Sequence, residues 1–179
     1  MTQIRIEYPD FFELVSSRYS CRAYTNAPVS HDEVMAILET ARLAPSACNK
    51  QPWKFMVLTS EEDKNVVIDS YSRDWIKTAP VYIVALGCEK EAWHRGSDNF
   101  DATPVDLSIA CEHICLAATS LGLGSCWVCN FDEEKLRAEL NISEEWIPIA
   151  IIPIGYPDPE VAVPEKKRKT IDEIVQWGK

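Results

Sequence analysis

The residues from Ala44 to Trp53 read Ala-Pro-Ser-Ala-Cys-Asn-Lys-Gln-Pro-Trp, and the rest of the chain is organised around them. A helical pattern ends just before this stretch, and a strand pattern over 54–58 begins just after it. Pro45 and Pro52 hold the residues before them in extended conformations, so we expect a stiff loop. Small polar side chains on such a loop suit the binding of a planar polar ligand. A well-packed helix-to-strand connection would show the same features, so both interpretations stay open.

Residues 44–53, here called the signature loop, resemble the Ala-Pro-Ser-x-x-Asn-x-Gln-Pro-Trp motif of the nitroreductase family of FMN-dependent NAD(P)H oxidoreductases. The family usually has a small residue at the position of Cys48. The resemblance implies that five residues of the loop contact the cofactor: Pro45, Ser46, Ala47, Asn49 and Gln51. It also implies a homodimer with FMN at the subunit interface, in which Pro45, Ser46 and Asn49 lie against the flavin bound mainly by the other subunit.

A second motif, Arg18-Tyr19-Ser20-Cys21-Arg22, carries two arginines and a serine at alternate positions, which point the same way in an extended segment. Arg18 can bind a phosphate with two hydrogen bonds, although a solvated surface turn would have a similar composition. With the aromatic Tyr24, the motif resembles the N-terminal FMN motif of the family. The resemblance implies cofactor contacts by Arg18, the backbone at Tyr19, Ser20 and Arg22. Arg22 would lie beside the N1/C2=O edge of the flavin, where a fixed cation favours the negative charge that grows on reduction.

Two further stretches resemble the family. Gly122-Leu123-Gly124-Ser125-Cys126-Trp127 ends a helical pattern and matches a Gly-Leu-Gly-x-x-Trp segment. The resemblance implies that the backbone of Trp127, Val128, Cys129 and Asn130 passes over the flavin, with an amide of Cys129 or Asn130 donating to N5. Within the four-cation run 166–169, Lys166 and Arg168 match a basic pair that reaches the FMN phosphate, although a solvated tail would look alike.

The apolar pattern predicts helices over 8–17, 31–43, 61–75, 103–121 and 133–140. Ser30 and Glu33 form a capping box at the start of the second of these, and Thr170 and Glu173 cap a last helix. Strands are expected over 54–59, 80–86 and 147–154. The strand over 80–86 is apolar enough to be buried on both faces, whereas Pro148 and Pro153 limit the last strand to an edge or to pairing at its ends. Residues 87–102 are irregular, and we expect a mobile excursion. The fold class is α+β in one domain over 1–179, and the resemblance implies a mixed central sheet flanked by helices.

The composition excludes several classes of protein. Acidic residues outnumber basic residues 28 to 18, which gives a net charge of −10 and disfavours nucleic acids and anionic membranes. The chain begins without an apolar run flanked by basic residues, and its longest apolar run, 147–154, is too short to span a bilayer. We therefore expect a cytoplasmic protein whose seven cysteines are reduced thiols.

These patterns predict an oxidoreductase that passes hydride from NADH or NADPH, through N5 of FMN, to a small organic acceptor such as a nitroaromatic or a quinone, by a ping-pong mechanism. The cofactor carries the chemistry, so we name no catalytic side chain and no metal. One alternative is the same fold with other flavin chemistry, such as reductive dehalogenation or flavin destruction. A less favoured alternative is a zinc or iron–sulfur site built from four thiols: Cys111, Cys115, Cys126 and Cys129.

Overall fold

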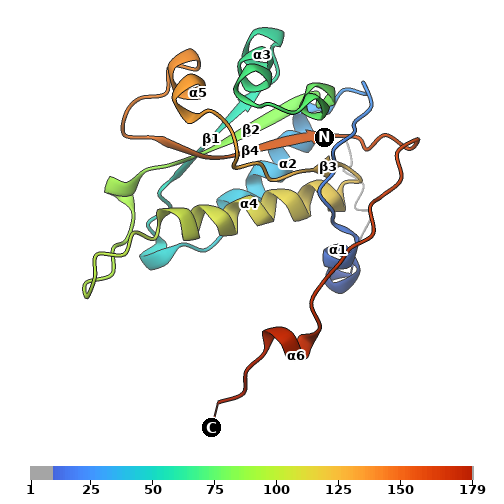
Figure 1. Ribbon diagram of the computed structural model, residues 1–179. Helices are drawn as coiled ribbons and strands as arrows, with labels where there is room; N and C mark the ends of the chain where they lie inside the picture. The colour runs from blue at the N-terminus through green and yellow to red at the C-terminus, as the bar shows by residue number, and fades with distance from the viewer. Residues whose placement is uncertain (1–9, 179) are drawn as a thin grey trace.

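A four-stranded sheet in the order β1-β2-β4-β3 forms the centre of the molecule. The structure is a computed structural model that describes residues 10–178. The strands are β1 (Trp53–Leu58), β2 (Val81–Gly87), β3 (Gly124–Ser125) and β4 (Ile147–Gly155), and each pair of neighbours is antiparallel. Helices cover both faces of the sheet, so the chain forms three layers (Figure 1). The predicted α+β class is confirmed.

One face of the sheet is covered by α2 (His31–Arg42) and α4 (Thr103–Ser120). The α2 helix begins at the predicted capping box, in which Ser30 and Glu33 each bind the other's backbone N–H. The α4 helix is apolar on most sides and packs in one core with α2 and β2; at its centre lie Ile37, Ile83, Leu107, Ala110 and Ile114. Every residue of β2 is buried, as the sequence predicts for a strand covered on both faces.

The opposite face carries α3 (Glu61–Ser70) and α5 (Glu133–Glu139). The helix predicted over 61–75 is too long, because α3 ends at Ser70 and Tyr71 is extended, with φ −128° and ψ 128°. The following residues form a separate 3-10 helix, η2 (Asp74–Thr78). Two more 3-10 helices are η1 (Ala47–Asn49) within the signature loop and η3 (Glu89–Glu91) after β2.

The edge position predicted for the last strand is wrong, because β4 lies between β2 and β3. Pro148 pairs with Leu86 where the register shifts, so the ladder is already irregular there. Ile151 exchanges both of its backbone hydrogen bonds with Val128, at 3.0 and 2.9 Å. N–H groups alternate sides along a strand, so an N–H at position 153 would point to the same side of β4 as the N–H of Ile151. On that side, position 153 falls in a gap between the Ile151–Val128 bridge and the Ser125–Ile154 pair, so the N–H that Pro153 lacks is not needed. Both prolines are thus accommodated inside the sheet.

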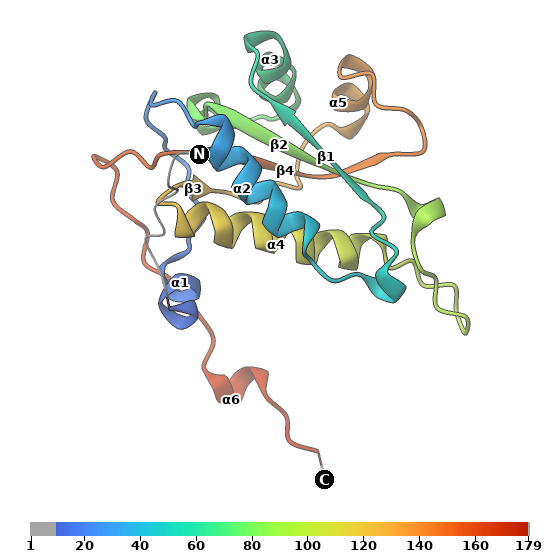
Figure 2. The same ribbon diagram turned by 180° about the vertical axis from the view of Figure 1, so that it is seen from behind.

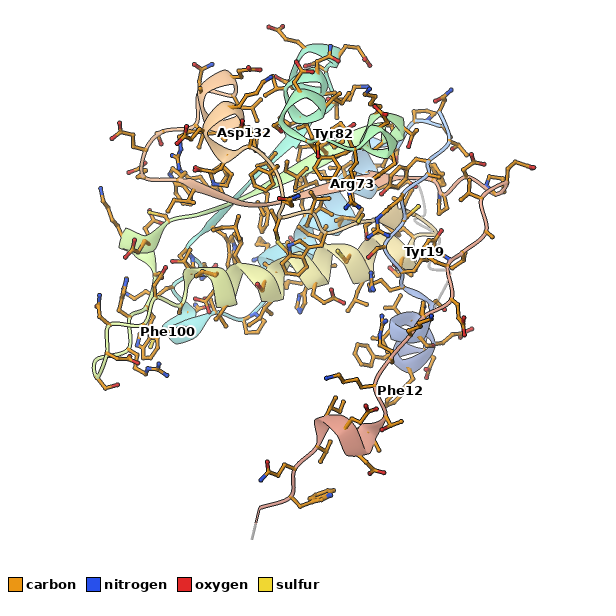
Figure 3. All side chains as sticks on the ribbon, in the orientation of Figure 1. Phe12, Tyr19, Arg73, Tyr82, Phe100 and Asp132 are labelled. Atoms are coloured by element: carbon orange, nitrogen blue, oxygen red, sulfur yellow. The ribbon has the colours of Figure 1, made fainter. Side chains whose placement is uncertain are left out.

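Parallel pairing in the described part of the chain is limited to one bridge between Ser20 and Ser125, so the sheet is mixed only through this contact. The region 87–102 is not wholly irregular: after η3, His94 and Asp101 form an antiparallel bridge, and Arg95 binds Asp98. This small hairpin projects from the body with Phe100 close to its end (Figure 3). Its mobility stays a prediction.

Helices α1 and α6, which lie near the two ends of the described residues, pack little against the three layers. Helix α1 (Phe11–Ser17) begins after Asp10, which accepts hydrogen bonds from its first turn; the predicted start at Tyr8 lies outside the described residues. Helix α6 (Ile171–Ile174) begins at the predicted Thr170–Glu173 capping box. The tail that carries α6 leaves the body, as both views show (Figures 1 and 2). Within residues 10–178, no helix combines the length and apolarity that a membrane span requires.

Candidate functional site

A basic cavity of about 150 Å³ lies between the 18–22 motif and the start of the tail. Five cationic side chains and one carboxylate, Glu165, line it; the cations are Arg18, Arg22, Lys166, Lys167 and Arg168. Tyr19 and Ser20 complete the wall together with Pro164. The structure thus brings together two predicted groups of residues, the N-terminal motif and the basic pair, which lie almost 150 positions apart in the sequence.

The cations of this basic cavity crowd one another. Partial burial lowers the pKa of Lys166, and the nearby charges of Arg18 and Arg168 lower it further. Lys166 also donates to the backbone carbonyl of Ser16, which ties the tail to the end of α1. Glu112 lies 3.9 Å from Arg18 and offers only partial compensation. An anion with several oxygen atoms would relieve this repulsion, so the cavity suits a phosphate.

Backbone pairing holds the 18–22 motif in place. The N–H of Cys21 donates to the carbonyl of Ser125 at 2.9 Å, and the buried Tyr24 hydroxyl donates to the carbonyl of Cys21 at 2.9 Å. The close approach depends on Gly124, where a Cβ would lie 2.7 Å from the side chain of Cys21. Gly122, with φ 75°, ends α4 just before this point. The two predicted motifs therefore support each other.

A second cavity of about 180 Å³, here called the aromatic cavity, shares Arg22 with the basic cavity. Its walls include the whole segment predicted to pass over a flavin: Trp127, Val128, Cys129 and Asn130. The indole N–H groups of Trp75 and Trp127 are buried and have no hydrogen-bond partner within residues 10–178. The Arg22 guanidinium also lies 5.9 Å from the Trp75 ring centroid. Aromatic side chains and a cation suit a flat ligand whose edge is rich in acceptors.

Three residues of the aromatic cavity were missed by the sequence analysis: Tyr71, Arg73 and Trp75. The rings of Tyr71 and Trp75 meet edge to face, with centroids 5.6 Å apart. The sequence assigned these residues to the end of a helix, where they would have been surface positions. The alternation of aromatic and basic residues after Ser70 was the available signal. Figure 3 labels Arg73 and Tyr19, which mark the aromatic and basic cavities.

The signature loop adopts an unusual backbone conformation. Cys48, Asn49 and Gln51 have φ values of 50°, 54° and 51°, which place three residues other than glycine in the left-handed region. The extended conformation predicted for Gln51, the residue before Pro52, is therefore wrong. Such conformations cost roughly 1 kcal/mol or more each and persist only where the surroundings impose them. Within the loop, Ser46 Oγ accepts the N–H of Gln51 at 2.9 Å. The loop is therefore specifically shaped, as a binding loop would be.

The signature loop does not line the basic or the aromatic cavity. Its Ala47 N–H reaches Asp106 in the first part of α4, whereas Arg18 lies beside Glu112 further along that helix. Six residues correspond to about 9 Å along a helix and to a different face of it. One chain thus carries two separate sets of predicted site residues: one set lines the basic and aromatic cavities, and the other is the group 45–51.

The four cysteines considered for a metal site do not form one. Within residues 10–178 no group of three or more His, Cys, Asp or Glu side chains is placed to hold a metal ion. Burial raises the pKa of the Cys111 thiol well above its usual value and that of Cys115 to about 12. Burial also raises the pKa of Cys126, although Arg22 and Ser20 oppose this effect. Cys111, Cys115 and Cys126 are buried and act as small core residues, whereas Cys129 is exposed.

An apolar groove of about 700 Å³ runs along the outer face of α4. Phe11, Val105, Ile109 and Leu116 supply its apolar lining, and Val105 is 50% exposed. His113 lies at this groove, with its Nδ1 3.0 Å from the carbonyl of Thr40. The groove is a large exposed apolar surface, and such surfaces commonly bind another protein.

Comparison with known proteins identifies relatives that span most of the chain. A protein of Archaeoglobus fulgidus, provisionally named an NADH dehydrogenase/NAD(P)H nitroreductase, is 31% identical over 153 residues, which cover 83% of this chain and 86% of that protein. Iodotyrosine deiodinase 1 of Rattus norvegicus is 25% identical over 209 residues, which cover 97% of this chain and 71% of that protein. A crystal structure from Exiguobacterium sibiricum, solved in complex with FMN, shows the same fold with a TM-score of 0.85 at 22% identity, covering 96% of this chain and 98% of that one.

The family model described as the nitroreductase family matches residues 15–72 and 64–156. These matches include the 18–22 motif, the signature loop and the segment after Gly122, which are three of the four stretches on which the resemblance rests; the basic run 166–169 lies outside them. The chain belongs to the nitroreductase family.

Proposed function

We propose that this protein binds FMN and uses it to transfer hydride from NADH or NADPH to a small organic acceptor. The observation that carries the proposal is the pair of adjoining cavities that share Arg22, one basic and one aromatic. Together they match the two ends of FMN, a phosphate and a flat ring system. The FMN in the related Exiguobacterium structure supports the same conclusion.

The residues of the basic cavity fit the phosphate. Arg18, Lys166 and Arg168 would contribute charge-assisted hydrogen bonds, and Ser20 a hydroxyl donor. A dianion placed among these cations would replace mutual repulsion by attraction. Lys166 would then hold its proton more tightly than in the free protein, because the charges that lower its pKa would be compensated.

The residues of the aromatic cavity fit the ring. The aromatic side chains of Tyr71, Trp75 and Trp127 would contact the ring, and Arg22 would place a positive charge beside its polar edge. The backbone of Cys129 and Asn130 would lie against the ring. Bound FMN supplies a ring that takes up hydride at one position and releases it again, so no protein side chain has to act as an acid or base in the first half of the reaction.

A second copy of the chain would complete the site. The signature loop carries Pro45, Ser46 and Asn49 but lines neither cavity of its own chain, so its contacts with FMN would be made across a homodimer interface. The apolar groove on α4 is the surface that a partner subunit would cover. Exposed apolar side chains on the tail, such as Ile171, Ile174 and Trp177, also require a surface that one chain does not provide.

Titration with FMN tests the proposal directly. We expect the protein to quench the fluorescence of one FMN per chain, and NADH or NADPH to bleach the bound flavin under anaerobic conditions. Light scattering in the same buffer should give the mass of a dimer, twice 20.3 kDa. Failure to bind FMN would refute the proposal, and a monomer that binds FMN fully would refute the shared site.

Reductive dehalogenation is a second candidate, favoured by the deiodinase relative that aligns with 97% of this chain. The two candidates share the cofactor and differ in the acceptor. Turnover should be measured with a nitroaromatic, a quinone and a halogenated phenol at equal concentrations. If only the halogenated phenol is turned over, with release of halide, the function is reductive dehalogenation and not the reduction of a nitroaromatic or a quinone.

A further inference from the structure

Asp106 is a buried carboxylate that the proposed function does not use. It lies in the first part of α4 and is 2% exposed. Its Oδ1 accepts the N–H of Ala47 at 2.9 Å, and its Oδ2 has no hydrogen-bond partner within residues 10–178. A buried carboxylate that loses a donor is strongly destabilised, because no water replaces the lost hydrogen bond.

The donor belongs to the signature loop at the start of its strained part. Ala47 is the first residue of η1, and the left-handed residues Cys48, Asn49 and Gln51 lie within the next four positions. The N–H of an initial helical residue has no partner within its own turn, so Asp106 supplies an acceptor that the loop lacks. Figure 2 shows η1 beside the first turn of α4, where the helix dipole favours a negative charge.

We propose that Asp106 is a positioning residue, which fixes the signature loop in the conformation that presents Ser46 and Asn49 to FMN. The inference rests on the proposed function for the identity of the ligand. If the loop moved away from α4 to relax its left-handed residues, it would lose the hydrogen bond from the N–H of Ala47 to Oδ1 of Asp106. The hydrogen bond therefore pre-organises a binding loop before the ligand and the second subunit arrive.

Two substitutions of similar size separate the hydrogen bond from packing. Asp106→Asn keeps an acceptor oxygen at the same place, and Asp106→Leu removes it. We expect Asp106→Asn to bind FMN within about threefold of the parent, and Asp106→Leu to bind at least about tenfold more weakly. Ala47→Pro removes the same hydrogen bond from the loop side, since proline lacks the N–H but suits a first helical position after the extended Ser46. It should weaken FMN similarly, and the double variant should show no further loss.

The conformation of the loop is measured separately, without FMN. Cys48 is exposed within the loop, so its rate of alkylation reports on the loop, and exposed Cys129 serves as an internal control. Mass spectrometry of the two peptides should show a changed rate at Cys48 in Asp106→Leu and Ala47→Pro and an unchanged rate at Cys129. Circular dichroism and the melting temperature identify a variant that has not folded, in which case the other variant decides.

The outcomes separate this inference from the proposed function. If the parent protein binds no FMN, the proposed function fails. The alkylation rate of Cys48 still tests whether Asp106 fixes the conformation of the signature loop. If the parent binds FMN, equal affinity in the folded Asp106→Leu and Ala47→Pro variants overturns the positioning role. An Asp106→Asn variant as weak as Asp106→Leu overturns it too, because the acceptor oxygen would then be irrelevant.

Discussion

Removal of Arg18 is the sharpest test of the basic cavity. A charge-assisted hydrogen bond contributes about 1.5–3 kcal/mol, and each 1.4 kcal/mol is about a factor of ten in affinity. Two features of the structure reduce the expected loss. Glu112 is half exposed and 3.9 Å away, so leaving it unpaired costs little. The four other cations that line the basic cavity also remain, and they still attract the phosphate. We therefore expect Arg18→Ala to weaken FMN by about tenfold to thirtyfold.

The assay is a titration of FMN fluorescence at fixed ionic strength, repeated with riboflavin, which lacks the phosphate. A phosphate contact predicts that Arg18→Ala weakens FMN but changes riboflavin by less than about twofold. The affinity of the variant for FMN should also depend less on salt than that of the parent. Arg42 provides a matched control, because it is an exposed arginine on α2 paired with Glu39, and its replacement by alanine should leave both ligands unaffected.

Two results would refute the assignment of Arg18. Equal FMN affinity in the parent and in Arg18→Ala would show that this guanidinium does not bind the phosphate. An equal loss for FMN and riboflavin would show that the substitution damages the cavity as a whole.

Four further predictions concern the reaction, the stability and the assembly. Because the donor and the acceptor must use the same ring in turn, double-reciprocal plots at several fixed acceptor concentrations should be parallel, and intersecting lines would contradict this. Arg22→Ala should slow anaerobic bleaching of the flavin by more than it weakens FMN, because negative charge grows beside Arg22 only as hydride arrives; bleaching at the parental rate would contradict this role. Tyr156→Phe removes a 2.6 Å hydrogen bond to Glu33 and should cost about 1 kcal/mol in urea unfolding at pH 7. Burial alone would raise the pKa of Glu33, but hydrogen bonds from Ser30 and Tyr156 lower it, so this stabilisation is present above the ordinary carboxylate pKa and should disappear as the pH falls through the lowered value. Val105→Glu places a charge in the apolar groove, so it should give a monomer by light scattering and abolish FMN binding. A dimer of unchanged stability would show that the α4 groove is not part of the interface.

Local sequence signals predicted the elements of the fold well. The capping boxes at Ser30 and Thr170 depend on side chains three positions apart, and both are present. The strand over 80–86 and the helix over 103–121 have enough apolar residues to show their type without tertiary context. Gly122 ended that helix as expected, because it takes a positive φ.

Local signals failed where the outcome depended on a distant partner. A proline predicts an edge strand only if the neighbouring strand would need an N–H at that position. Pro153 lies in the gap between the Val128–Ile151 bridge and the Ser125–Ile154 pair, where no N–H is needed. Tyr71, Arg73 and Trp75 became part of a cavity because α3 stops at Ser70, and the pattern of apolar residues did not reveal that stop.

The sequence by itself determined the family, the helices and strands, and the two kinds of motif that match FMN, because each depends on residues close together in the chain. Only the tertiary structure decided how those motifs are distributed. It joined residues 18–22 with Lys166 and Arg168 in one basic cavity, and it placed the signature loop on another part of α4. The physical reason is the geometry of α4, an 18-residue helix that carries Asp106 and Glu112 on different faces. The signature loop at Asp106 and Arg18 at Glu112 are therefore held apart within one chain.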